Sequence, residues 1–176
     1  MIKFLSRKSD PTEVQMGQYL YFYDQFMDEC DAISVSANPS GFTPLSTISS
    51  VLGWDWDMVN KFAAEVNERN EVGVSRCLSH KLLLVPHVLN NLPQYRLAED
   101  LFKACNAIKA NTLRFTHYGL ILGAFPREQI KSIMEYIIDN EDSLSIEKIY
   151  WDIDERFEQE VATLWNELRN LVAPTE

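Results

Sequence analysis

The residues best suited to chemistry in this sequence are Cys77 and His80, separated by two positions, with His87 further along. Thiolate and imidazole are zinc ligands, but a structural zinc ion needs four of them, and neither a second close pair nor a fourth nearby ligand follows. The chain also has no Gly-rich phosphate loop ending in Lys-Ser/Thr, no Gly-x-Ser-x-Gly and no His-Glu-x-x-His. We therefore expect no metal, no cofactor and no enzymatic activity. An enzyme whose site is assembled from distant residues is retained as an alternative.

A second group of residues combines aromatic and acidic side chains, since Trp54, Asp55, Trp56 and Asp57 follow one another directly. Exposed tryptophans are typical anchors of protein interfaces, so these four residues are candidates for binding a partner. The alternative is that both tryptophans belong to the core.

The charge balance of the chain is strongly acidic, with 16 Lys and Arg against 26 Asp and Glu and a formal net charge of −10. Such a surface repels a phosphate backbone, which disfavours binding to nucleic acid. From Asp139 onward there are 11 acidic and 3 basic residues. The acids there, Asp152, Glu155 and Glu158 among them, are candidates for contact with a basic protein or a DNA-binding protein.

Cysteine use and hydrophobic runs bear on the compartment. The three cysteines are an odd number, widely spaced, and do not indicate a disulfide framework. The apolar run within residues 1–10 is too short for a signal peptide, and Leu82–Val85 is far shorter than a membrane span. We expect a cytoplasmic protein that does not enter a membrane.

The element that must position the tryptophans and acids is the stretch 43–68. A short apolar helix is predicted up to Gly53, and a longer helix begins a few residues later with Val59, Phe62, Ala63 and Val66 on one face. Glycine can end the first helix because it readily takes positive φ. Two short strands joined by a turn at 79–81 are predicted over 71–85.

This stretch resembles the winged helix-turn-helix superfamily over residues 43–87. Ser49, Gly53 and Val59 occupy the small, turn-glycine and aliphatic positions of the helix-turn-helix signature, and the paired strands look like a wing. The resemblance implies that the second helix lies in the DNA major groove. The residues that would then touch DNA are Asn60, Lys61, Arg69, Arg76, His80 and Lys81.

The charges of this unit argue against DNA. Asp55 and Asp57 stand at the helix end that would approach phosphates, and between Ser40 and His87 five acids face four bases. Acidic winged-helix proteins that act through protein contacts are the nearer comparison.

The rest of the chain is predicted to be helical. Residues 10–33 form an aromatic helix that belongs to the core or meets a partner with one face. Residues 91–139 form a helical unit, with a short apolar helix over 112–123, and are a possible second helix-turn-helix. Residues 143–172 form a long acidic helix, whose apolar stripe packs in the core or forms a homodimer.

The sequence thus predicts a mainly α, multi-helix fold with a winged-helix-like helix-turn-helix, a small β-hairpin and a long C-terminal helix, in a single compact domain over 1–176. The function expected is that of an acidic cytoplasmic regulatory or adaptor protein that acts by protein-protein contacts. A sequence-specific DNA-binding transcriptional regulator is the first alternative, and an enzyme is the second.

Overall fold

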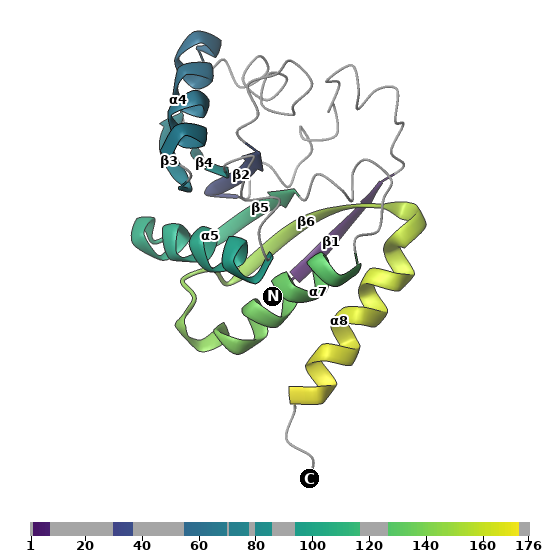
Figure 1. The fold of residues 1–176 in the computed structure, drawn as a ribbon. Coiled ribbons are helices and arrows are strands. Elements are labelled where there is room, and N and C mark those ends of the chain that lie inside the picture. The colour runs from purple at the N-terminus through teal and green to yellow at the C-terminus, as the bar shows by residue number, and fades with distance from the viewer. Residues whose placement is uncertain are drawn as a thin grey trace.

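A six-stranded sheet organises the protein (Figure 1). The computed structural model describes residues 2–7, 30–36, 55–69, 71–77, 80–85, 94–116 and 127–172. The strands are β1 (Ile2–Arg7), β2 (Ala32–Ser36), β3 (Gly73–Cys77), β4 (His80–Val85), β5 (Thr112–Thr116) and β6 (Lys148–Asp154). Their order is β1-β6-β5-β2-β4-β3, and every neighbouring pair is parallel except β3 and β4.

Helices cover both faces of this sheet. They are α4 (Trp56–Arg69), α5 (Gln94–Ile108), α7 (Arg127–Asp139) and α8 (Glu158–Val172), with short 3-10 turns η3 (Glu141–Ser143) and η4 (Glu155–Phe157). The crossing from β2 to β4 runs one way across the sheet and the crossing from β4 to β5 runs back. Because such connections are right-handed, α4 lies on one face, whereas α5 and α7 lie on the other (Figure 1).

The main core lies between the sheet and α5, α7 and α8. Side chains of β5 and β6 alternate, so that Leu113, Phe115, Ile149 and Trp151 face these helices while Tyr150 packs with Leu5 and Cys30. The helices contribute the following buried residues: Leu97, Ala98, Leu101, Phe102, Cys105, Ile130, Ile133, Met134, Ile137, Val161, Leu164 and Leu168. The apolar stripe of α8 is therefore used inside its own chain.

The amino ends of the strands are joined by local hydrogen bonds. Helix α5 ends with Lys109 at a φ of 56°, and the N–H of Ala110 donates to the carbonyl of Cys105 at 3.1 Å. The amide of Asn106 then binds the next segment, donating to the Ser143 carbonyl at 3.2 Å and accepting from the Ser145 N–H at 2.7 Å. These contacts fix the start of β5 and the approach to β6.

The predicted fold class is wrong, since the protein is α/β and not mainly α. Residues 112–116, predicted as helix, form β5, and residues 148–154, predicted as part of the C-terminal helix, form β6. Residue 32 already begins β2, inside the helix predicted over 10–33. Pairing with distant strands decides these segments, because a short apolar run suits a strand as well as a helix.

Other local predictions are confirmed. The longer helix predicted within 43–68 is α4, the helical unit predicted over 91–139 contains α5 and α7, and the paired strands predicted over 71–85 are β3 and β4. These strands are not a wing, however, because β4 also pairs with β2 inside the sheet. Residues 10–29 of the aromatic helix predicted over 10–33, and the first helix of the predicted helix-turn-helix, lie outside the described residues. Within the described helices, none is long and apolar enough to cross a membrane.

Candidate ligand-binding site at the carboxyl ends of the strands

The fold contains a topological switch point between β2 and β5. These strands are parallel neighbours, yet the described helix that follows β2 is α4 on one face, whereas the helix that follows β5 is α7 on the other. In open parallel sheets, ligands bind outside the carboxyl ends of two such strands, because the chain diverges there to opposite faces. The carboxyl ends of β2 and β5, at Ser36 and Thr116, are therefore the candidate site.

The two strands at the switch point carry buried polar residues. Among the residues whose exposure is described, Ser34 in β2 and Arg114 in β5 are the polar or charged residues in the buried class, at 1% and 0% exposure. Arg114 lies opposite Ile33, and Ser34 lies opposite Phe115, so alternation places Arg114 and Ser34 on different faces of the sheet. Arg114 does make interactions of its own. A buried polar group needs a compensating interaction, so Ser34 and Arg114 mark the two strands of the switch point.

The sequence beyond these strand ends is rich in small and polar residues. Ser36 is followed by Ala37, Asn38, Pro39, Ser40 and Gly41, and Thr116 is followed by His117, Tyr118 and Gly119. Both segments lie outside the described residues. Glycine and other small residues allow a backbone N–H to approach a ligand closely, which is how α/β proteins bind phosphate groups.

A surface groove lies next to this edge, between α7 and α8. It has a volume of about 370 Å³ and is lined by Arg127, Gln159, Glu160, Thr163, Leu164 and Glu167. Because α7 follows β5 and α8 follows β6, both helices start from the carboxyl side of the sheet. The groove therefore starts at the carboxyl side of the sheet and follows α8 from residue 159 to residue 167.

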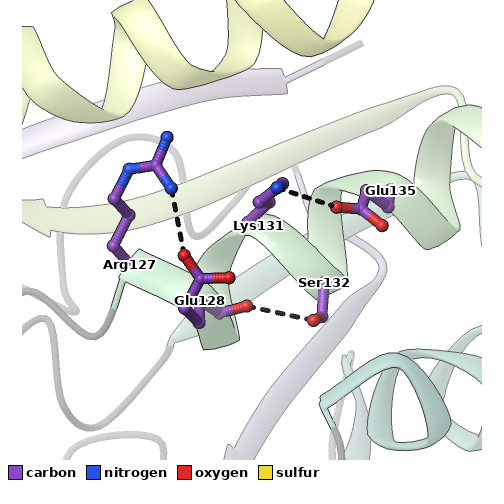
Figure 2. Close-up of polar contacts among 5 residues, drawn as sticks. All are labelled: Arg127, Glu128, Lys131, Ser132 and Glu135. Carbon is purple, nitrogen blue, oxygen red and sulfur yellow. Dashed lines mark hydrogen bonds and ion pairs between the residues drawn. The ribbon is translucent and has the colours of Figure 1, made fainter.

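Figure 2 shows the polar contacts along α7. Arg127 Nη1 donates to Glu128 Oε1 at 3.1 Å, and Lys131 Nζ lies 3.9 Å from Glu135 Oε1. The Ser132 hydroxyl donates to the Glu128 carbonyl at 3.0 Å. Since the side chains of Arg127 and Glu128 are 50% and 81% exposed, their ion pair is weak and Arg127 can exchange its partner.

The resolved pKa shifts do not indicate an activated acid, base or nucleophile. Burial, with a smaller effect from Asp31, raises the pKa of the Cys105 thiol to about 12. Burial likewise raises the pKa of Tyr95 and of Tyr136. A hydrogen bond from Lys103 lowers the pKa of Glu99. Each of these shifts keeps its group in the ordinary charge state at neutral pH.

The acids predicted to bind a partner at 55 and 57 have a local role in α4. Asp55 caps the helix, since its Oδ1 accepts from the N–H of Asp57 at 3.0 Å and of Met58 at 3.4 Å. Asp57 is exposed in the first turn, where a negative charge complements the helix dipole. Trp54 lies outside the described residues, and Trp56 begins α4 without a described side chain.

The other predicted partner residues lie elsewhere. Asp152 is in β6, between Leu5 of β1 and Thr116 of β5, so it belongs to an interior strand and not to a helix face. Glu155 in η4 and Glu158 at the start of α8 are exposed. The structure does not join this group to the acids of α4, which lie at the opposite end of the sheet (Figure 1).

The residues of the DNA-binding alternative are divided between two settings. Asn60, Lys61 and Arg69 are on α4, of which Lys61 and Arg69 are exposed. Arg76 pairs with Lys81 between β3 and β4, and His80 pairs with Cys77. The predicted winged-helix geometry is therefore wrong, because these strands are part of the central sheet. No three His, Cys, Asp or Glu side chains among the described residues lie together as a metal site would require.

The strand order and the switch point define an open, mostly parallel α/β domain. No family model and no curated protein matches the chain. Among solved structures it is similar to the macro domain of ganglioside induced differentiation associated protein 2, with a TM-score of 0.56 and 11% identity over 94% of this chain and 84% of that one.

Two longer chains contain a similar fold. Tomato leucine aminopeptidase matches with a TM-score of 0.58 and 10% identity, over 97% of this chain and 36% of that one. An alphavirus chain with a protease and a zinc-binding domain matches with a TM-score of 0.51 and 11% identity, over 100% of this chain and 25% of that one. At such identities the likeness establishes the α/β fold alone.

Sequence reasoning missed the switch point and the buried polar residues Ser34 and Arg114. A signal for β5 was present, because Leu113 and Phe115 alternate with Thr112, Arg114 and Thr116, which is the period of a strand. No local pattern carries the strand order, so the position of the site depends on the tertiary fold.

Proposed function

We propose that this protein is a ligand-binding α/β domain that takes a small phosphate-bearing molecule, of the nucleotide class, at the carboxyl ends of β2 and β5. The observation that carries the proposal is the divergence of the chain to opposite faces after these two neighbouring strands. The sequence after each strand end contains small residues, among them Gly41 and Gly119, and residues of this kind allow a backbone N–H to approach a phosphate oxygen closely.

The acidic net charge is compatible with this ligand. A polynucleotide meets the whole surface, whereas a single nucleotide meets only the groups at its own site.

The test is titration of the isotopically labelled protein with nucleoside monophosphates, nucleoside diphosphates and nucleoside diphosphate sugars, followed through backbone amide resonances. The expected result is saturable shifts at the ends of β2 and β5, Ser36 and Thr116 included. The amides of Asp31 and Asn111, at the opposite ends of the same strands, serve as the internal control. Shifts confined to the amino ends, or no saturable shift with any of these ligands, would overturn the proposal.

A second candidate is the regulatory or adaptor role through protein contacts that the sequence predicts. It is supported by the exposed acids of the C-terminal region, among them Glu155, Glu158, Glu160 and Glu167. A cytoplasmic location is part of this proposal and is supported by the free thiol of Cys105. Pull-down from extract with nuclease treatment, followed by elution with rising salt, tests it. Failure to retain a stoichiometric protein at low salt would contradict it.

A further inference from the structure

We propose that the groove between α7 and α8 binds a basic peptide segment, with arginine or lysine side chains placed on Glu160 and Glu167. This site is separate from the ligand site at β2 and β5, and it gives the adaptor role a specific surface. The argument rests on the shape of the groove, on the pairing of its carboxylates and on the spacing between them.

The groove has one wall from each helix. Glu160, Thr163 and Glu167 are spaced three and four residues apart, so they lie along one face of α8. Leu164, which is 3% exposed, lies at its base, and Arg127 of α7 lines it from the other side. Figure 2 shows the guanidinium of Arg127 extending from the start of α7 toward its neighbour Glu128. The alkyl part of an arginine or lysine side chain of the peptide can thus lie near Leu164 while its cationic end contacts the glutamates.

The two glutamates have no cationic partner among the described residues. Other exposed acids nearby do, since Glu128 pairs with Arg127, Glu135 with Lys131 and Glu141 with Arg169. Neither Glu160 nor Glu167 takes part in an ion pair or a side-chain hydrogen bond within the part of the chain that the structure describes. Arg127, the cation that lines the groove, is paired with Glu128, so Glu160 and Glu167 leave the groove with a net negative charge that is complementary to a basic ligand.

The spacing of the carboxylates selects a peptide over a metal ion. Glu167 is seven positions after Glu160, which corresponds to about 10 Å along a helix. A metal ion needs its oxygen ligands within about 2.6 Å, and no third ligand accompanies these two among the described residues. Three residues of a polyproline II chain span about 9 Å and place side chains i and i+3 on the same face, so arginines at these positions match the two glutamates.

The experiment is calorimetric and NMR titration of the full chain with the peptide acetyl-Arg-Gly-Gly-Arg-amide at low salt. Its matched control is the same peptide with citrulline in place of arginine, which keeps the shape and removes the charge. We expect saturable shifts at residues 159–167 and at Arg127 with the arginine peptide, and none with the citrulline peptide. Equal binding of both peptides, or shifts outside α7 and α8, overturns the proposal.

Variants distinguish binding in the groove from long-range attraction by the negative charge of the whole protein. The double variant E160Q/E167Q should bind the arginine peptide about five- to tenfold more weakly, because two exposed charge-assisted contacts are lost. The control E68Q/E71Q removes the same charge from the end of α4 and from the residue two positions before β3, outside the groove, and should change the affinity less than about twofold. An equal loss in both variants means long-range attraction only and overturns the site. Because peptide shifts at α8 and nucleotide shifts at β2 and β5 are read separately, either proposal can fail alone.

Discussion

The carboxylate of Asp31 holds the first residue of β5 through Thr112. Oδ1 of Asp31 accepts the N–H of Thr112 at 3.0 Å and its hydroxyl at 3.1 Å, and the N–H of Asp31 donates back to the Thr112 Oγ1 at 2.9 Å. Oδ2 accepts the N–H of Asn111 at 3.0 Å. One side chain thus satisfies two backbone donors and joins β2 to β5 at the amino ends, opposite the candidate ligand site.

Replacing Asp31 should weaken the whole sheet. In D31A two N–H groups lose their acceptor, and we expect the free energy of unfolding to fall by about 2–3 kcal/mol. Urea denaturation measures it. T112S keeps the hydroxyl and should stay within about 0.5 kcal/mol of the natural protein. A D31A change as small as that of T112S would show that this network contributes little.

Gly73, the first residue of β3, allows α4 to approach the sheet closely. A Cβ at this position would lie 2.3 Å from Val66 Cγ2 and 2.8 Å from Phe62 Cζ. G73A should therefore lower the free energy of unfolding by about 1–3 kcal/mol through overpacking. V74A, at the neighbouring and 38% exposed position, is the control and should have a small effect. Thermal and urea unfolding measure both variants. Equal losses of stability in G73A and V74A would contradict the prediction.

Alkaline pH should destabilise the protein through Cys105. The folded pKa of its thiol is raised to about 12 from 9.0, mainly by burial. The unfolded thiol therefore ionises first, and this contribution to stability is complete below pH 9 and is lost as pH rises toward 12. The free energy of unfolding should fall by up to about 1.4 kcal/mol per pH unit in this window. Burial also raises the pKa of Tyr95 and Tyr136, and these add to the loss above pH 10.

The contribution of Cys105 is isolated by C105A, which is expected to be less stable at pH 8 but to lose stability less steeply between pH 9 and 10.5. Denaturant unfolding at several pH values gives both slopes. Equal slopes in the two proteins would assign the alkaline loss to the tyrosines alone.

Two variants of Asp55, the residue that caps α4, distinguish a structural role of its side chain from a role in binding a partner. D55A removes the acceptor for two backbone N–H groups and should cost about 1 kcal/mol of stability. D55S retains a capping oxygen without the charge and should recover most of that loss. If binding to a protein partner falls in D55A but not in D55S, the cap, and through it the helix, matters to the partner. A loss in both variants would assign the charge itself to the interface.

Local patterns predicted several elements correctly because their periods are unambiguous. In α7, Ile130, Ile133, Met134 and Ile137 recur at helical spacing and are all buried. By contrast, Ile149 and Ile153 stand four residues apart in the same series as Phe157 and Val161, so β6 and α8 read as one helix. Only pairing with β1 and β5 makes residues 148–154 a strand.

The candidate site was less accessible to sequence reasoning than the helices. The tryptophans and acids at 54–57 were singled out by residue type, yet Asp55 proves to be a helix cap. Ser34 and Arg114 are near the switch point, but they are about 80 positions apart in the chain and come together only because β2 pairs with β5. Non-local strand order, and not composition, decides where this site lies.

The pairing of β1 with β6 has a consequence for synthesis of the protein. Ile2 lies opposite Ile149, and the ring centroids of Phe4 and Trp151 are 5.9 Å apart, so the first described strand pairs with the last one. On the ribosome, the chain emerges from its amino end, and the first strand stays without its neighbour until residue 154 has been made. Until then the apolar side of β1 is available to chaperones, and a nascent chain stalled before β6 is a target for quality control.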